Sequence, residues 1–200
     1  PTSLRSAVQF SLPAKLSAFI CGSQNNMLRI LSKIQRIGIV TEPLPKIDEP
    51  ALEEIGAQLK ARLGQMFNGS LAIREVDAGS CNGCELEIHA LNNPYYGIER
   101  FGVHFVASPR HADMLLVTGP VSRHMEAALR RTYDATPEPK LVIAVGECGA
   151  NGGEFGVSYA SCGAVSNVIP VDAVIRGCPP TPLNLMRGIL QAIEGRSGRK

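Results

Sequence analysis

Four cysteines of this chain stand just after stretches that read as buried β-strands. Cys81 and Cys84 form the motif Cys-Asn-Gly-Cys, while Cys148 and Cys178 each follow a separate apolar run. Ligands gather outside the carboxyl ends of the strands of an open parallel sheet. Cysteines that are far apart in sequence can converge at that edge, and four thiolates at one place make a metal site. The spacing therefore predicts a metal centre at the edge of a sheet.

The residue pattern alone leaves iron–sulfur, zinc and unrelated thiols open. A redox dithiol formed by Cys81 and Cys84 would leave Cys148 and Cys178 unexplained. The glycine-rich segment 146–153 lets backbone amides approach a cluster and donate to its sulfur atoms, and no Lys-Ser/Thr follows it as in a phosphate-binding loop. Cys178 precedes a proline, as at the end of ferredoxin ligand runs. These features favour an iron–sulfur site over zinc.

The remaining cysteines and the nearby polar residues are given simpler roles. Cys21 and Cys162 are expected to be structural or incidental, because four ligands already complete such a site. Glu85 and Glu87 suit the first turn of a helix, where acidic residues stabilise the macrodipole, although a proton relay or a contact with a partner remains open. His111 is expected to be an ordinary turn residue, with a place near the cysteines as the alternative.

Composition bounds the class of protein. The chain has 200 residues, of which 44% are hydrophobic and 19% charged, which is typical of one globular α/β domain. Aromatic residues make up 5% without any tryptophan, so a nucleic-acid partner is not expected. Six cysteines are too few for a disulfide scaffold. No apolar run is long enough to span a bilayer.

The first 48 residues differ in kind from the rest. No Asp or Glu occurs before Glu42, whereas five basic residues and several apolar ones do. Such a segment suits a transit peptide, an amphipathic arm on an anionic membrane or a partner subunit, or a flexible tail. The apolar residues favour the arm. We therefore predict a basic N-terminal extension over 1–48 and one domain over 49–200.

Alternating apolar patterns predict the elements of that domain. Helices are expected over 50–65 and 123–134, and a C-terminal helix is expected to be capped by Thr181 and ended by Gly195. Strands are expected over 71–76, 103–107, 114–118, 141–146 and 171–175. Strands that alternate with helices imply an α/β fold with a parallel sheet and right-handed crossovers.

Several motifs between residues 71 and 190 together resemble a known family. They are Cys81-Asn82-Gly83-Cys84-Glu85, Ser108-Pro109-Arg110-His111-Ala112-Asp113, Pro137-Glu138-Pro139-Lys140, Cys148 with Gly152-Gly153, and Ile169-Pro170-Val171-Asp172 leading to Gly177-Cys178-Pro179-Pro180. The set resembles the small subunit of membrane-bound nickel–iron hydrogenases of the group 4, formate hydrogenlyase-like type. It equally resembles the homologous 20 kDa subunit of respiratory complex I.

The resemblance implies a flavodoxin-like domain, with helices on both faces of a parallel sheet, after an N-terminal extension. It implies one [4Fe–4S] cluster held by Cys81, Cys84, Cys148 and Cys178. The cluster would relay electrons between a ferredoxin-like iron–sulfur subunit and a large catalytic subunit that holds the nickel–iron centre. The chain would thus be an oxidoreductase subunit that is inactive alone. With membrane subunits in the same complex, it would lie peripherally on the cytoplasmic side of the membrane.

One spacing separates the two branches of the family. Complex I subunits place two adjacent cysteines where this chain has Cys81-x-x-Cys84, so the chain looks like the hydrogenase side. Two alternatives are retained, namely a complex I-like subunit that passes electrons to quinone and a zinc-stabilised scaffold subunit. The extension before residue 70 and the residues around Cys162 depart from the family pattern.

Overall fold

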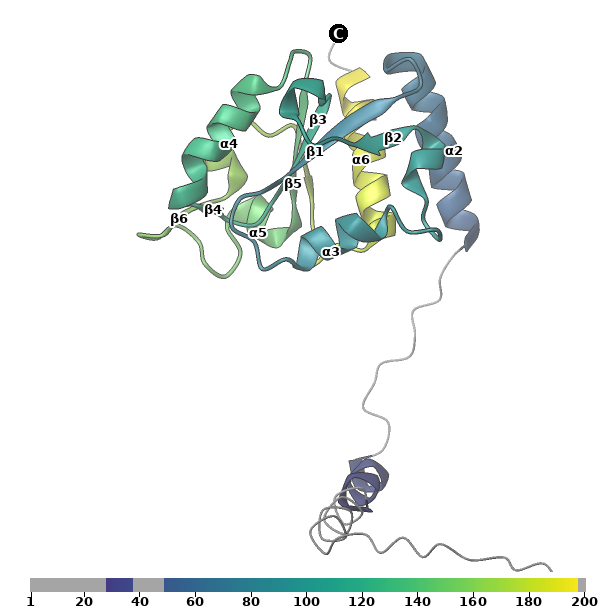
Figure 1. The fold of residues 1–200 in the computed structure, drawn as a ribbon, viewed down its shortest axis with the longest axis vertical. Helices are drawn as coiled ribbons and strands as arrows, with labels where there is room; N and C mark the ends of the chain where they lie inside the picture. The colour runs from purple at the N-terminus through teal and green to yellow at the C-terminus, as the bar shows by residue number, and fades with distance from the viewer. Residues whose placement is uncertain (1–27, 38–48, 198–200) are drawn as a thin grey trace, which may run out of the picture. The chain divides into compact units, whose positions relative to one another are not determined.

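The computed structural model describes residues 28–37 and 49–197 (Figure 1). The chain divides into two compact units, Pro1–Ile47 and Asp48–Lys200, and each is described by itself. In the first unit, residues 28–37 form a helix. Cys21 and the proline-rich segment 41–45 lie outside the described residues.

The second unit is built on one parallel sheet of five strands. Its strands follow the spatial order β2-β1-β3-β5-β7, which is the order of flavodoxin-like folds. All four neighbouring pairs are parallel. The predicted α/β class with a flavodoxin-like sheet is therefore confirmed. The strands are β1 (Leu71–Asp77), β2 (Val103–Phe105), β3 (Met114–Thr118), β5 (Leu141–Val145) and β7 (Ala173–Ile175).

Helices cover both faces of the sheet (Figure 1). The helices α2 (Glu49–Met66) and α6 (Pro182–Ser197) lie on one face, and α4 (Arg123–Ala135) lies on the other. Two shorter helices come after β1 and β5: α3 (Gly83–Ala90) follows β1 after a short loop, and α5 (Gly146–Asn151) follows β5 directly. Three 3-10 turns complete the unit, namely η1 (Ile98–Phe101), η2 (Pro109–His111) and η3 (Val165–Asn167).

The strand residues explain why the sheet is covered twice. In β3, Leu116 belongs to the apolar cluster under α2 and α6, whereas Leu115 belongs to the cluster under α4. In β5, Ile143 and Val142 divide in the same way. Side chains that alternate between two buried faces require a continuous apolar run, and that is the pattern of these two strands.

Two motif aspartates stabilise the amino ends of the strands. The side chain of Asp113 accepts a hydrogen bond from the backbone N–H of Ala72 at 2.9 Å, and that of Asp172 accepts one from Val142 at 2.9 Å. The backbone N–H of each aspartate also donates to the carbonyl of the same residue, Asp113 to Ala72 at 2.8 Å and Asp172 to Val142 at 2.9 Å. Asp113 and Asp172 therefore help to set the registers of β1 and β5.

Some boundaries differ from the sequence expectation. Thr181 does cap α6, since its hydroxyl accepts from the N–H of Asn184 at 3.3 Å. The helix nevertheless continues past Gly195 to Ser197, because Gly195 does not adopt the positive φ with which a glycine ends a helix. A second sheet, in which β4 (Val121–Ser122) pairs with β6 (Ser161–Gly163), was not expected. Among the described residues, no helix combines the length and apolarity needed to cross a bilayer.

The difference in burial between β5 and β7 predicts that shortening a side chain to alanine lowers the free energy of unfolding more on β5 than on β7. Ile143 is fully buried between β3 and β7, so Ile143→Ala should lower the free energy of unfolding by about 2–5 kcal/mol. Val174 on β7 is 46% exposed, and Val174→Ala should cost less than about 1.5 kcal/mol. Urea unfolding followed by circular dichroism measures both. Equal losses would contradict the described burial.

Candidate metal centre

Three strand ends bring the four predicted cysteines to one edge of the sheet. Cys81 lies between β1 and α3, Cys84 lies in the first turn of α3, Cys148 lies in α5 after β5, and Cys178 lies between β7 and α6. Because β1, β5 and β7 run in the same direction, all three segments leave the sheet at its carboxyl edge. In Figure 1, α3 and α5 mark this edge.

Short contacts show that the three segments touch one another. A Cβ on Gly146, at the start of α5, would lie 2.7 Å from the Sγ of Cys84. A Cβ on Gly83 would lie 3.5 Å from the Sγ of Cys81 and 3.9 Å from the Cβ of Pro179. The N–H of Glu147 donates to the carbonyl of Gly177 at 3.1 Å. The segments after β1, β5 and β7 are thus packed together at the cysteines.

Glycine is required where the thiols meet the backbone. Gly146 has a φ of 79°, in the left-handed region that side chains disfavour. Gly153 also has a positive φ, and a Cβ there would lie 2.7 Å from the Sγ of Cys148. A methyl group at either position would occupy the space of a cysteine sulfur. The glycine-rich segment therefore serves to admit sulfur atoms close to the chain.

The thiols also influence one another electrostatically. Burial raises the pKa of Cys84 to about 12, and the negative charges of Glu85, Cys81, Cys148 and Cys178 add to that rise. Burial likewise raises the pKa of Cys148, with further contributions from Cys178 and Cys81. Beside burial, the charges of neighbouring cysteines therefore oppose the ionisation of Cys84 and Cys148. Positive charge supplied at the site would favour the thiolate forms of these two residues.

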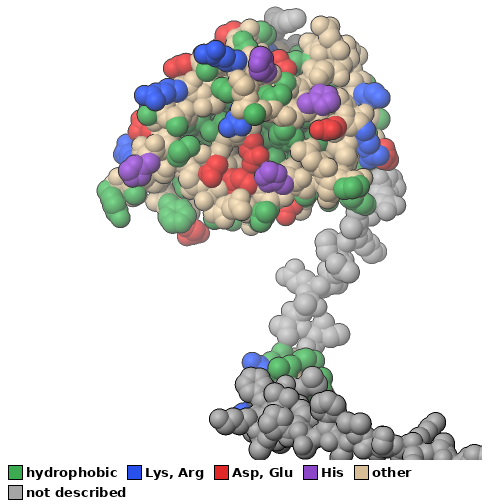
Figure 2. Space-filling model, in the orientation of Figure 1, with side chains coloured by type: hydrophobic (Ala, Val, Ile, Leu, Met, Phe, Trp, Pro, Cys, Tyr) green, Lys and Arg blue, Asp and Glu red, His purple; other side chains and the backbone are tan. Residues whose placement is uncertain are grey.

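The cysteines lie at the surface of the unit. Cys81 and Cys178 are exposed, and Cys84 and Cys148 are half-buried. Leu86 is an exposed apolar side chain on α3, two residues after Cys84, and further exposed apolar side chains lie in the loop between α5 and β6. Figure 2 shows apolar side chains along this edge. The exposed apolar residues after α5 are Phe155, Val157 and Tyr159.

Glu85 is the most unusual polar residue of the site. It directly follows Cys84 in the first turn of α3, yet only 5% of it is exposed. Neither of its carboxylate oxygens has a hydrogen-bond partner within 28–37 and 49–197. Leaving a buried carboxylate unpaired costs free energy. The expected role at the helix start does not account for this burial.

The donor set and its surroundings fit an iron–sulfur cluster. Cys81, Cys84, Cys148 and Cys178 supply four sulfurs at one edge, and glycines leave room beside Cys84 and Cys148. Iron–sulfur clusters are held by cysteine thiolates in this way. In the described part of the chain, no three His, Cys, Asp or Glu side chains are grouped closely enough around one point to hold a single metal ion.

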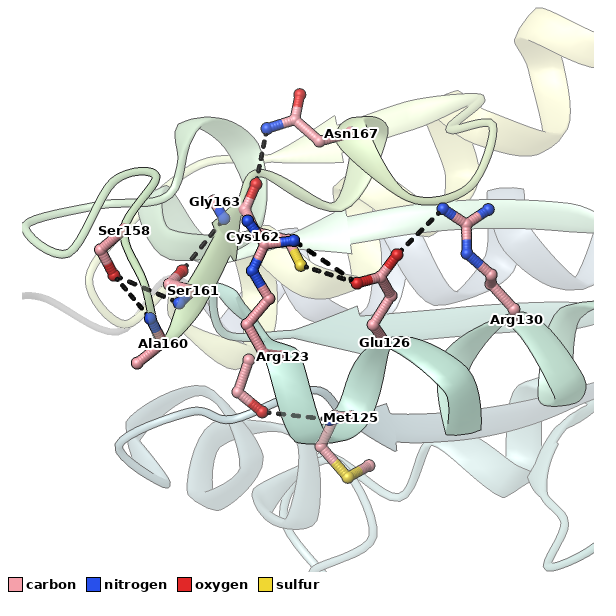
Figure 3. A network of polar contacts seen from close by, with 11 residues as sticks. Arg123, Met125, Glu126, Arg130, Ser158, Ala160, Ser161, Cys162, Gly163 and Asn167 are labelled. Carbon is pink, nitrogen blue, oxygen red and sulfur yellow. Dashed lines mark hydrogen bonds and ion pairs between the residues drawn. The ribbon is translucent and has the colours of Figure 1, made fainter.

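Cys162 belongs to a separate network of polar contacts, which joins β6 to α4 (Figure 3). It is buried in β6, and its thiol donates to the Oε2 of Glu126 at 3.3 Å. Arg123 and Arg130 pair with the same carboxylate at 3.6 and 3.2 Å. The side chain of Asn167 donates to the carbonyl of Cys162 at 2.8 Å. This position matches the structural role expected from the sequence.

His111 and Glu87 were also considered from the sequence as possible neighbours of the cysteines. His111 ends η2 just before β3 begins, so it lies at the amino edge and not near the cysteines. The alternative that placed it near them is wrong, because β3 separates the two edges. Glu87 is half-buried on α3.

Two supporting contacts were missed from the sequence. Glu147, next to Cys148, forms an ion pair of 2.9 Å with Arg176, which precedes the Cys178 segment. Nothing local in the sequence signals it. Asp77 accepts hydrogen bonds from the N–H groups of Gly79 and Ser80, both at 2.8 Å, which turns the chain toward Cys81. The Asp-x-Gly-Ser order is a turn signal that could have revealed this contact.

Comparison with known proteins places the chain in a family. A model of the 20 kDa subunit of NADH–ubiquinone oxidoreductase matches residues 81–192, more than half of the chain. The chain belongs to this family. The match begins at Cys81 and includes Cys84, Cys148 and Cys178.

Relatives in the family include hydrogenase subunits. The chain is 43% identical over 142 residues to formate hydrogenlyase subunit 7 of Escherichia coli K12, which covers 71% of this chain and 56% of that protein. It is 44% identical over 134 residues to "Probable membrane-bound hydrogenase subunit mbhJ" of Pyrococcus furiosus, covering 67% and 80%. The chain therefore spans little more than half of the first relative and most of the second.

A solved structure supports the same fold. A chain of the membrane-bound sulfane sulfur reductase, an archaeal respiratory membrane complex, aligns with a TM-score of 0.57 at 33% identity. The alignment covers 74% of this chain and 77% of that one. The fold of residues 49–197 is thus one that subunits of membrane complexes use.

The network around Glu126 predicts a pH dependence of stability. The hydrogen bond from Cys162, and then the contact with Arg130, lower the pKa of Glu126 below its usual range. A lowered pKa contributes stability above the unfolded value of about 4.3, and that contribution is lost as the pH falls through the folded pKa. Glu126→Gln should therefore flatten the fall in the free energy of unfolding below about pH 4.3.

Urea unfolding at a series of pH values measures this effect. Glu99→Gln, the same change in the exposed turn η1, serves as the matched control. If both variants followed the wild-type pH dependence, the assigned role of the Cys162–Glu126 hydrogen bond would be wrong.

Proposed function

We propose that this chain is an electron-transfer subunit that holds one [4Fe–4S] cluster through Cys81, Cys84, Cys148 and Cys178. The observation that carries the proposal is the meeting of four thiols from three strand ends at one exposed edge. The cluster would supply one-electron transfer. The chain would supply four thiolates, space beside them at Gly146 and Gly153, and a rigid sheet that fixes their separation.

The site is suited to work against another subunit. Glu85 needs a hydrogen-bond donor that the described residues do not provide. Cys81 and Cys178 are exposed, and the exposed apolar side chain of Leu86 lies on α3 two residues after Cys84, as expected for a surface that a partner covers. We infer that a large catalytic subunit covers this edge. A ferredoxin-like iron–sulfur subunit would exchange electrons with the cluster, and the chain would be inactive alone.

Hydrogen is the favoured substrate of the complex. The Cys81-x-x-Cys84 spacing is that of the hydrogenase side of the family, and two relatives at 43% and 44% identity are named as hydrogenlyase and hydrogenase subunits. Nickel and iron would be bound by the large subunit, with the assembly placed peripherally on the cytoplasmic side of a membrane. The name of the matching family keeps quinone as the alternative acceptor. An assay of the purified complex for hydrogen evolution and for quinone reduction distinguishes the hydrogenase from the quinone-reducing alternative.

Replacing one ligand tests the cluster directly. Cys148→Ser should lower the iron and sulfide content of anaerobically purified protein well below the about four of each that a [4Fe–4S] cluster contains, and should abolish its reduced EPR signal. Cys162→Ser is the matched control, because Cys162 is bonded to Glu126 and not to the other cysteines. That variant should keep its iron.

Two outcomes would contradict the proposal. Stoichiometric zinc without iron in the wild type would instead support the zinc-stabilised scaffold. Equal iron loss in Cys148→Ser and Cys162→Ser would mean that iron retention does not depend on the proposed ligand set.

The glycine that faces Cys84 offers a second test. Gly146→Ala places a methyl group in the space of the Cys84 sulfur and strains a backbone with positive φ, so most of the bound iron should be lost. In the control Gly64→Ala the new methyl group meets no atom within 4 Å, and iron content should stay at the wild-type value. Metal analysis with the visible absorption spectrum measures both. Full iron in Gly146→Ala would show that the sulfur of Cys84 is not constrained there.

A further inference from the structure

The helix 28–37 carries two stripes of different chemistry. Ile30, Ile34 and Ile37 recur at i, i+4 and i+7, so they share one face. Each is preceded by a cation, and these cations form a second stripe with the same spacing one position earlier. The cations are Arg29, Lys33 and Arg36. The basic stripe therefore runs directly alongside the apolar one.

The apolar stripe is exposed in this structure. Ile30, Ile34 and Ile37 are 58%, 58% and 52% exposed, and Leu28 and Leu31 add further exposed apolar surface. Figure 2 shows apolar and basic side chains on this helix. Five large aliphatic side chains on ten residues would be unfavourable in water, so this face requires an apolar environment.

The positive charge of the segment before Glu42 indicates which apolar environment the helix contacts. No Asp or Glu precedes Glu42, and Arg5 and Lys15 add to the three cations of the helix. An anionic lipid surface attracts such a segment without requiring paired acidic residues, and it accepts aliphatic side chains beside its headgroups. Long basic side chains next to an inserted stripe extend to the phosphates while their methylenes stay in apolar surroundings.

We propose that helix 28–37 is a membrane-surface anchor that lies in the headgroup region of an anionic bilayer. The ten described residues span about 15 Å as a helix, and a basic stripe directly beside an apolar one suits a helix that lies in the plane of the membrane. Ile30, Ile34 and Ile37 enter the acyl boundary, and Arg29, Lys33 and Arg36 contact lipid phosphates. The anchor is independent of the cysteine site.

Vesicle flotation with the full 200-residue chain tests the anchor. The wild type should float with vesicles of phosphatidylcholine and phosphatidylglycerol, much less with phosphatidylcholine alone, and less as salt is raised. Each cation near the surface contributes about fivefold to partitioning, so changing Arg29, Lys33 and Arg36 together to Gln should weaken binding by on the order of a hundredfold.

The apolar stripe has its own matched pair of variants. Ile34→Gln should weaken binding about tenfold or more, because a buried aliphatic side chain is lost. Ser32→Gln introduces the same residue outside both stripes and should bind within about twofold of the wild type. Iron content should be equal in all these variants, since every substituted position lies outside the sequence of the cysteine-bearing unit.

Three results would overturn the anchor. The first is a wild type that does not float with anionic vesicles. The second is binding by Ile34→Gln or by the triple variant that equals the wild type. The third is a wild type that does not bind vesicles, combined with release of the chain from its purified complex by the same substitutions. That result would assign the helix to a protein partner.

Discussion

Parallel pairing of β1, β3, β5 and β7 is the constraint on which the rest of the structure depends. Because the strands run in one direction, the segments that leave β1, β5 and β7 emerge at one edge. Parallel strands require helical crossovers, and the helices that make them bury both faces of the sheet. The same geometry therefore provides the core and gathers the cysteines. Asp113 and Asp172 support it from the opposite edge.

The edge of the sheet that carries the cysteines contains arrangements that lower stability within this chain, unlike the packed apolar core. The thiol of Cys84, whose pKa is raised by burial and by nearby negative charge, and the buried Glu85 without a hydrogen-bond partner are unfavourable within this chain. Positive φ at positions 146 and 153 and the sulfur atoms beside them both require glycine, which has no Cβ. Such local conflicts gather at functional sites, where a ligand or a partner completes the arrangement. Elsewhere in the described residues, the Nε of Arg74 and one Nη of Arg196 are also buried without a hydrogen-bond partner, but each belongs to a side chain with other donors.

The motif residues and Thr181, which follows the last of them, divide into two groups with different physical roles. The cysteines and their glycines form the proposed cluster site, where identity is set by chemistry. The aspartates at 113 and 172 satisfy strand N–H groups, and Thr181 caps the helix that follows the last cysteine. Cys162 falls into neither group, because its hydrogen bond to Glu126 joins β6 to α4. A shared pattern of residues therefore reflects both the site and the frame that holds it.

By itself the sequence determined the strands, the main helices and the convergence of the cysteine segments. Continuous apolar runs and helical spacing are local signals, and the parallel arrangement follows from their alternation. Only the tertiary structure decided the burial of Glu85, the bond between Cys162 and Glu126, the ion pair between Glu147 and Arg176, and the small sheet of β4 and β6. Each of these depends on segments that are distant along the chain, so no local pattern encodes it. These contacts form only after the strand order has brought the distant segments together.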